Sequence, residues 1–141
     1  MTTSFVFQFA NTLAMLMWVM MIFSPNWKGT RFLIDYKLVP IALSILYGIY
    51  IIQSLQDGGG MDFSTLESVM NLFTMEIAVL AGWLHYLAFD LLVGMWILDQ
   101  NQTLKINHFI LVPCLLGAFM LGPIGFLLFM IVRTIRLKSI A

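Results

Sequence analysis

Three side chains within one apolar stretch have the chemistry of proton donors and acceptors: Asp90, His85 and Tyr86. Asp90 follows Glu76 by 14 positions, roughly 21 Å along a helix, which would place its carboxyl group deep in a bilayer. A charged carboxylate at that depth costs at least about 2.5 kcal/mol on insertion scales, so it needs a reason to be there. Two interpretations stay open. Asp90 either takes part in a ligand site or proton transfer, or forms a hydrogen bond between helices, with Asn11 as one potential partner.

Helical geometry relates the three candidates to one another. Tyr86 precedes Asp90 by four positions, so its hydroxyl can approach that carboxyl group. His85 points about 140° away from Asp90, so the two do not form a direct pair on one helix. A substrate or a water molecule would have to join them. For His85 an ordinary hydrogen bond between helices is an equally good interpretation.

The composition indicates that the natural solvent of this chain is lipid. Of its 141 residues, 61% are hydrophobic and 10% are charged, whereas soluble domains carry roughly 25% charged residues. The formal net charge is zero and no basic block is present, which argues against a nucleic-acid partner. We therefore expect an integral membrane protein whose partner is membrane lipid.

Long apolar runs predict an all-α bundle of four transmembrane helices in a single domain that covers residues 1–141. The spans are expected at about 5–23, 38–55, 76–98 and 108–132, close to the roughly 20 residues that cross a hydrocarbon core. A short amphipathic helix is expected before the third span, at 61–73, where apolar residues recur at helical spacing.

The predicted ends of these elements follow from breaker residues. Ser24-Pro25-Asn26 ends the first run, Gln56-Asp57-Gly58-Gly59-Gly60 the second, and Asp99-Gln100-Asn101-Gln102 is interpreted as a tight polar turn. Ser64 and Glu67 have the spacing of a capping box for the amphipathic helix. Pro113 and Gly122-Pro123 interrupt the fourth run.

A structural ion pair and the absence of a metal site are further expectations. If the fourth helix runs antiparallel to the third, Arg133 ends near the depth of Glu76, and the two can form a salt bridge at the membrane boundary. His85 and His108 lie too far apart along the predicted helices to hold one iron, and the eleven methionines are scattered. We therefore expect no metal and no cofactor.

The run from Gly82 to Trp96, with its Trp-x-His-x-x-Ala-x-Asp core, resembles the plant neoxanthin-synthase family of abscisic-acid-deficient-four-like membrane proteins. Other matching features lie across nearly the whole chain: Asn11, Trp18, Pro25, Trp27 and Thr30, residues 63–73, and Gly122-Pro123 with Gly125 and Arg133. The resemblance implies four membrane helices and, in plants, a part in converting violaxanthin to neoxanthin. The N-terminus has no Ser/Arg-rich transit sequence, so the expected location is a bacterial inner membrane, and the plant substrate is not carried over.

Two functions are compatible with these features. The first is an isomerase that opens an epoxide on a carotenoid or another isoprenoid lipid, with Asp90 as the acid assisted by His85 or Tyr86. Trp83, Phe89 and Trp96 would line its apolar slot, together with Asn11. The second is a non-catalytic protein that binds a pigment or lipid or assembles with a partner. A site between the subunits of a homo-oligomer suits either function, because a chain of this size has little room for a closed site.

Overall fold

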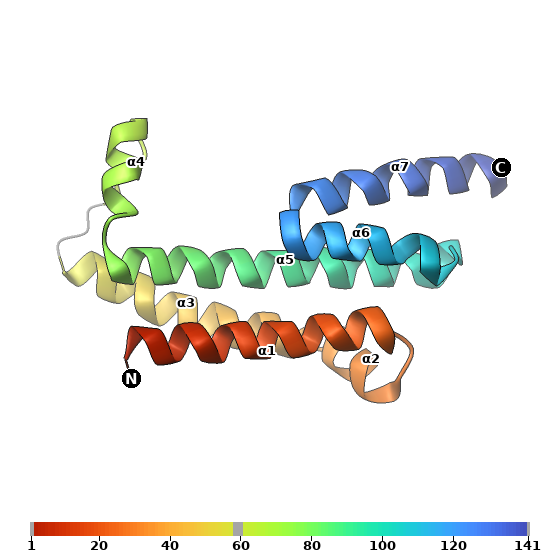
Figure 1. The fold of residues 1–141 in the computed structure, drawn as a ribbon, viewed down its shortest axis with the longest axis horizontal. Coiled ribbons are helices and arrows are strands. Elements are labelled where there is room, and N and C mark those ends of the chain that lie inside the picture. Colours follow the sequence, from red (N-terminus) through yellow and green to blue (C-terminus); the bar gives the residue numbers. More distant parts are fainter. Residues whose placement is uncertain (1, 58–60, 141) are drawn as a thin grey trace. The chain divides into compact units, whose positions relative to one another are not determined.

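Three long apolar helices form nearly half of the chain. The structure is a computed structural model, and it describes residues 2–57 and 61–140. Within this described part, α1 (Thr3–Phe23), α3 (Leu38–Gln56) and α5 (Glu76–Leu104) are the helices long and apolar enough to cross a membrane. The spans predicted at 5–23, 38–55 and 76–98 are confirmed as helices (Figure 1).

The helix α5 is longer than expected. It continues through the residues interpreted as a polar turn, Asp99 to Gln102, and ends only at Leu104. These polar side chains are compatible with a helix because they bond to neighbouring elements: Asp99 accepts from Lys37, Gln100 accepts from Arg133, and Asn101 bonds to the backbone of Ile106. The turn predicted from their polarity is therefore wrong.

Two short helices join the long ones. The helix α2 (Lys28–Asp35) lies in the first polar connection, where no helix was predicted, and α4 (Leu66–Leu72) lies within the expected amphipathic segment. Thr65 caps α4, because its hydroxyl accepts from the Ser68 amide at 3.1 Å. The predicted capping box of Ser64 and Glu67 is thus placed one residue too early. The predicted break at Gly58-Gly59-Gly60 lies outside the described residues.

The predicted fourth span, 108–132, is not one helix. It consists of α6 (His108–Leu121) and α7 (Pro123–Ile140), which pack against each other as a hairpin (Figure 1). Gly122 makes the turn with φ = 37°, a conformation that favours glycine. Pro123 cannot continue the preceding helix, but it suits the first position of the next one. Pro113 lies inside α6 without breaking it. The fold is therefore all-α, and the expected bundle of four spanning helices is replaced by three long helices and a hairpin.

The chain divides into two units, each with its own buried side chains. The first contains residues 2–14, 38–57 and 61–88 and so combines the start of α1 with α3, α4 and the start of α5. In α1, Val6, Ala10 and Ala14 are buried at intervals of four, which places them on one helix face. Ala81 and Leu84 of α5 are fully buried. Small residues at such positions let helix backbones approach closely.

The second unit contains residues 15–37 and 89–140. Its hairpin begins where the His108 imidazole Nε2 bonds to the Ile22 carbonyl at 2.6 Å and has its tip at Gly122, beside Asp90. It returns to the end of α5, where Arg136 donates to the Leu104 carbonyl at 3.0 Å. Since Asp90 lies at the midpoint of the 29-residue α5, the hairpin enters and leaves at one end of that helix. The two helices of the hairpin therefore lie along the second half of α5.

Many large apolar side chains are exposed along the long helices. Only 33%, 28% and 44% of the most apolar windows of α1, α3 and α5 are buried by the protein itself. The rest of their surface presents residues such as Leu16, Ile45, Ile52 and Phe89, each more than half exposed. A surface of this kind is favourable in hydrocarbon and unfavourable in water. The three helices are thus compatible with a membrane protein.

Candidate functional site

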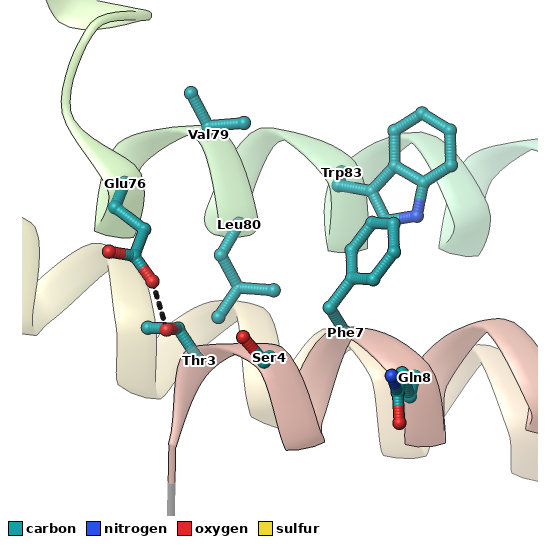
Figure 2. A pocket seen from close by; sticks show the side chains of 8 residues that line it. All are labelled: Thr3, Ser4, Phe7, Gln8, Glu76, Val79, Leu80 and Trp83. Atoms are coloured by element: carbon teal, nitrogen blue, oxygen red, sulfur yellow. Dashed lines mark hydrogen bonds between the residues drawn. The ribbon is translucent and has the colours of Figure 1, made fainter.

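A groove of about 330 Å³ lies between α1 and α5 in the first unit. Figure 2 shows its lining, which comes from one face of each helix. The four residues from α1 are Thr3, Ser4, Phe7 and Gln8, and the four from α5 are Glu76, Val79, Leu80 and Trp83. In both helices the lining positions, some of them adjacent, recur after three or four residues, so each set lies on one helix face. The groove therefore follows directly from helical periodicity.

One end of the groove is polar. Thr3 donates a hydrogen bond from its hydroxyl to the Glu76 carboxylate, as Figure 2 shows, and Ser4 lies beside Thr3. Glu76 is the first residue of α5, where the free amides of the helix N-terminus carry a partial positive charge that favours a carboxylate. This end can both donate to and accept from an oxygen atom of a ligand.

The other end of the groove is aromatic. Phe7 and Trp83 face each other with ring centroids 5.7 Å apart (Figure 2). The Trp83 indole nitrogen donates to the Asn11 side-chain oxygen at 2.8 Å, and its ring stacks on Tyr86 at 5.3 Å. Trp83 is thus held from both sides in one orientation. A rigid aromatic wall of this kind suits a flat or ring-shaped apolar group.

Only some of the residues expected to form a site come together around the groove. Trp83 lines it, and Asn11 and Tyr86 contact Trp83. His85 belongs to the same unit and lies beside Tyr47 of α3, with ring centroids 5.6 Å apart. Asn11, proposed as a partner of Asp90, instead accepts from Trp83.

Three expected site residues belong to the second unit. Asp90 is 8% exposed, and its Oδ1 lies so close to Gly122 that a Cβ atom there would be only 2.6 Å away. The Trp96 ring packs on Phe126 and Phe129 of α7, at 5.7 and 5.4 Å. Phe89 is 56% exposed. The surroundings of Asp90 and Trp96 therefore favour a role in holding the α6–α7 hairpin.

The ion pair expected between Glu76 and Arg133 depended on an unbroken fourth helix. That unbroken helix is not present, because α6 ends at Leu121 and α7 begins at Pro123. Glu76 accepts from Thr3, and the Arg133 guanidinium donates to the Gln100 side chain at 3.3 Å. The Glu76–Arg133 ion pair stays a prediction.

A cluster of charges in the second unit was not foreseen from the sequence. Asp99 accepts from Arg31 at 3.0 Å and from Lys37 at 2.9 Å, and Arg31 also contacts Asp35 at 3.2 Å. The cluster joins Arg31 of α2, and Lys37 just after that helix, to Asp99 of α5. One available signal was the presence of three cations in the first connection, Lys28, Arg31 and Lys37, and of the carboxylate of Asp99 at the end of the third apolar run. Within residues 2–57 and 61–140, no group of three potential metal ligands lies close enough to hold an ion.

Fold and site define a class of small all-α proteins with apolar helices that suit a bilayer and an amphipathic groove between two of them. The chain matches the model of a family described as ABA DEFICIENT 4-like over residues 5–129. Since this match covers most of the 141 residues, the chain belongs to that family, which confirms the resemblance carried by the Trp83-to-Asp90 motif. No curated protein and no solved structure was found to match it.

Proposed function

We propose that this protein resides in a membrane and binds, in the groove between α1 and α5, the oxygenated end group of an isoprenoid lipid such as a carotenoid. The observation that carries the proposal is the amphipathic lining, with the Thr3–Glu76 pair at one end and the Phe7–Trp83 wall at the other. Family membership supports the same ligand class. Location in a bacterial inner membrane and assembly into a homo-oligomer stay predictions.

The size of the groove indicates which part of such a lipid it holds. Its volume of about 330 Å³ is at the lower end of the range for small-molecule sites, roughly 300 to 1,000 Å³. That space suits a substituted ring and the first part of a chain. The remaining hydrocarbon would run along the exposed apolar surface of the helices, in contact with bilayer lipid.

The polar end provides the selectivity in this proposal. Lipid tails are as apolar as the aromatic wall, so moving a hydrocarbon chain from the bilayer into the groove gains little free energy. A ligand hydroxyl can donate to the Glu76 carboxylate, which already accepts from Thr3, whereas an epoxide oxygen only accepts and would need the Ser4 hydroxyl as its donor. Because the Thr3–Glu76 pair is exposed, solvent weakens a charge-assisted hydrogen bond there to about 1 kcal/mol, which corresponds to a preference of about fivefold.

A binding measurement with two carotenoids tests this proposal. Protein in nanodiscs is titrated with violaxanthin, which carries ring oxygens, and with β-carotene, which has none. We expect tighter binding of violaxanthin and loss of that preference in Glu76→Gln. Glu67→Gln on α4 is a matched control, since Glu67 does not line the groove. Equal affinity for the two carotenoids in the unaltered protein would contradict the proposal.

Isomerisation of the bound lipid is a second candidate function, favoured by the carboxyl group at the polar end of the groove. Opening an epoxide breaks a C–O bond, gives a proton to the oxygen and releases a neighbouring carbon-bound proton to a base, with no net oxidation. Glu76, as a carboxylate, is the candidate base in the groove, and Tyr86 and His85 are candidate proton donors in the same unit; Asp90 is the alternative acid. A product of unchanged mass and altered retention, lost in Glu76→Gln but retained in Asp90→Asn, would place the reaction in the groove.

A further inference from the structure

A second cavity, of about 310 Å³, lies entirely within the second unit. It is bounded by the connection between α1 and α2, the last turns of α5 and the start of α6. Its polar lining residues are Asn26, Asn101, Gln102, Lys105 and His108. None of the proposed functions above uses this cavity.

Two of these residues form a rigid wall. The Asn101 amide bonds to both backbone groups of Ile106, accepting from its N–H at 2.7 Å and donating to its carbonyl at 3.1 Å. The His108 ring bonds to the Ile22 carbonyl at 2.6 Å; since a carbonyl only accepts, Nε2 is the donor. Both side chains are therefore fixed without a ligand.

Three other lining side chains have open hydrogen-bonding capacity. Within residues 2–57 and 61–140, the side chains of Asn26, Gln102 and Lys105 have no hydrogen bond or ion pair. Lys105 adopts φ = 50°, which fixes the backbone from which its side chain extends. The cavity thus combines one unpaired ammonium group with two free amides.

The charge of the lining favours an anion. It contains the Lys105 ammonium and no carboxylate. The neighbouring carboxylate on α5, Asp99, is already compensated by Arg31 and Lys37. In addition, α6 begins at His108, and the N-terminus of a 14-residue helix carries a partial positive charge. An anion with several acceptor oxygens would satisfy all of these groups.

The position of the cavity indicates the source of such an anion. The 29 residues of α5 extend over about 43 Å, whereas the hydrocarbon core is about 30 Å thick. If α5 crosses the bilayer, its last turns, which carry Asn101 and Gln102, lie at the level of the lipid headgroups. Phosphate groups are the abundant anions at that level.

We infer that this cavity binds a phosphate group, supplied by the headgroup of an anionic phospholipid and held by Lys105, Gln102 and Asn26. Native mass spectrometry of the full chain in neutral detergent tests the inference. Binding of phosphatidylglycerol is compared with that of galactosyl diacylglycerol, which has the same tails and no phosphate. We expect tighter binding of phosphatidylglycerol, weakened about tenfold in Lys105→Gln and retained in Lys105→Arg.

Controls separate this site from general electrostatics and from misfolding. Lys138→Gln removes an exposed charge from α7, outside the cavity, and should bind as the unaltered protein does. Gln102→Ala, with an unchanged melting temperature, should also weaken binding. Equal affinity for the two lipids, or an equal loss in Lys138→Gln, would overturn the inference. Displacement of phosphatidylglycerol by millimolar inorganic phosphate would support the phosphate site and identify free phosphate as a second source.

Discussion

The indole nitrogen of Trp83 donates a 2.8 Å hydrogen bond to the side-chain oxygen of Asn11, across the interface between α1 and α5. Trp83 lines the groove, whereas Asn11 lies one helical turn beyond Phe7 on α1. The bond therefore joins the two helices that form the groove and fixes the ring that forms its aromatic wall. Both residues were expected to bind substrate. In the structure they form one hydrogen-bonded pair, in which Trp83 lines the groove and Asn11 holds the Trp83 ring.

Asn11→Leu should reduce stability by removing the acceptor for the Trp83 indole. Hydrogen bonds between membrane helices contribute about 0.6 kcal/mol on average, and rarely more than about 1.7 kcal/mol. A double-mutant cycle with Trp83→Phe, measured by unfolding in mixed micelles, should give a coupling energy within that range. Strictly additive single effects would show that the bond adds nothing to stability.

Gly125→Ala should be one of the most damaging small substitutions in the protein. A Cβ at Gly125 would lie 1.9 Å from the Ala118 amide nitrogen, so the backbones of α6 and α7 would have to separate. We expect a loss of roughly 3 kcal/mol, at the upper end for overpacking. The control is Gly48→Ala on α3, where nothing lies within 4 Å. Helix propensity makes that substitution neutral or stabilising by up to about 1 kcal/mol. A similar melting temperature for the two variants would contradict the close packing of the hairpin.

Asp99→Asn should destabilise the second unit by removing the negative charge that Arg31 and Lys37 share. The three side chains are between 23% and 36% exposed, so solvent screens the interaction and the expected loss is about 1 kcal/mol. The control Asp35→Asn alters an ion pair with a 58% exposed carboxylate and should have a smaller effect. Raising the salt concentration should shrink the difference between Asp99→Asn and the unaltered protein. A difference independent of salt would contradict an ionic origin.

Asp62, before α4, should titrate at a lower pH than an ordinary aspartate. Its carboxylate accepts hydrogen bonds from the Ser64 amide and the Ser68 hydroxyl, at 2.9 and 2.8 Å, and its contacts with Ser64 and then Ser68 lower its pKa. Because the folded-state pKa is the lower one, this contribution to stability is present above the unfolded-state pKa. It is lost as the pH falls through the folded-state value.

NMR titration of the Asp62 carboxyl carbon measures this directly. We expect Ser64→Ala to raise the pKa of Asp62 toward the ordinary value, because the Ser64 side chain makes the largest contribution to the shift, while the bond from the Ser64 backbone amide is retained. An ordinary pKa in the unaltered protein would contradict this local structure.

The sequence predicted the long helices well because their signal is strong. A run of about twenty apolar residues bounded by Ser24-Pro25-Asn26, or starting at Leu38, has few alternative structures. The α6–α7 hairpin was missed because Gly122-Pro123 has the same sequence whether it kinks a helix or reverses the chain. The packing of Gly125 on Gly117 and Ala118 decides between the two, and it depends on contacts that composition does not reveal.

The candidate site was predicted only in part. The sequence analysis singled out Trp83 and Glu76 by their residue types and their positions along the third apolar run. The groove that they line also needs Thr3, Ser4 and Gln8, which look like ordinary polar residues in the sequence. Helical spacing places Thr3, Ser4, Phe7 and Gln8 on one face of α1, and that signal was available. The α5 face that α1 covers could not be deduced, because several faces of α5 combine aromatic and small residues.

Photo-crosslinking tests the central claim, isoprenoid binding in the groove between α1 and α5, most directly. The protein in nanodiscs is irradiated with a photoreactive xanthophyll, and the adducts are mapped by peptide mass spectrometry. We predict adducts within residues 3–8 and 76–83, abolished by Val79→Trp, which fills the groove. They should persist in Ile49→Trp, a control at a 55% exposed position on α3. Adducts confined to other segments, or unaffected by Val79→Trp, would contradict the claim.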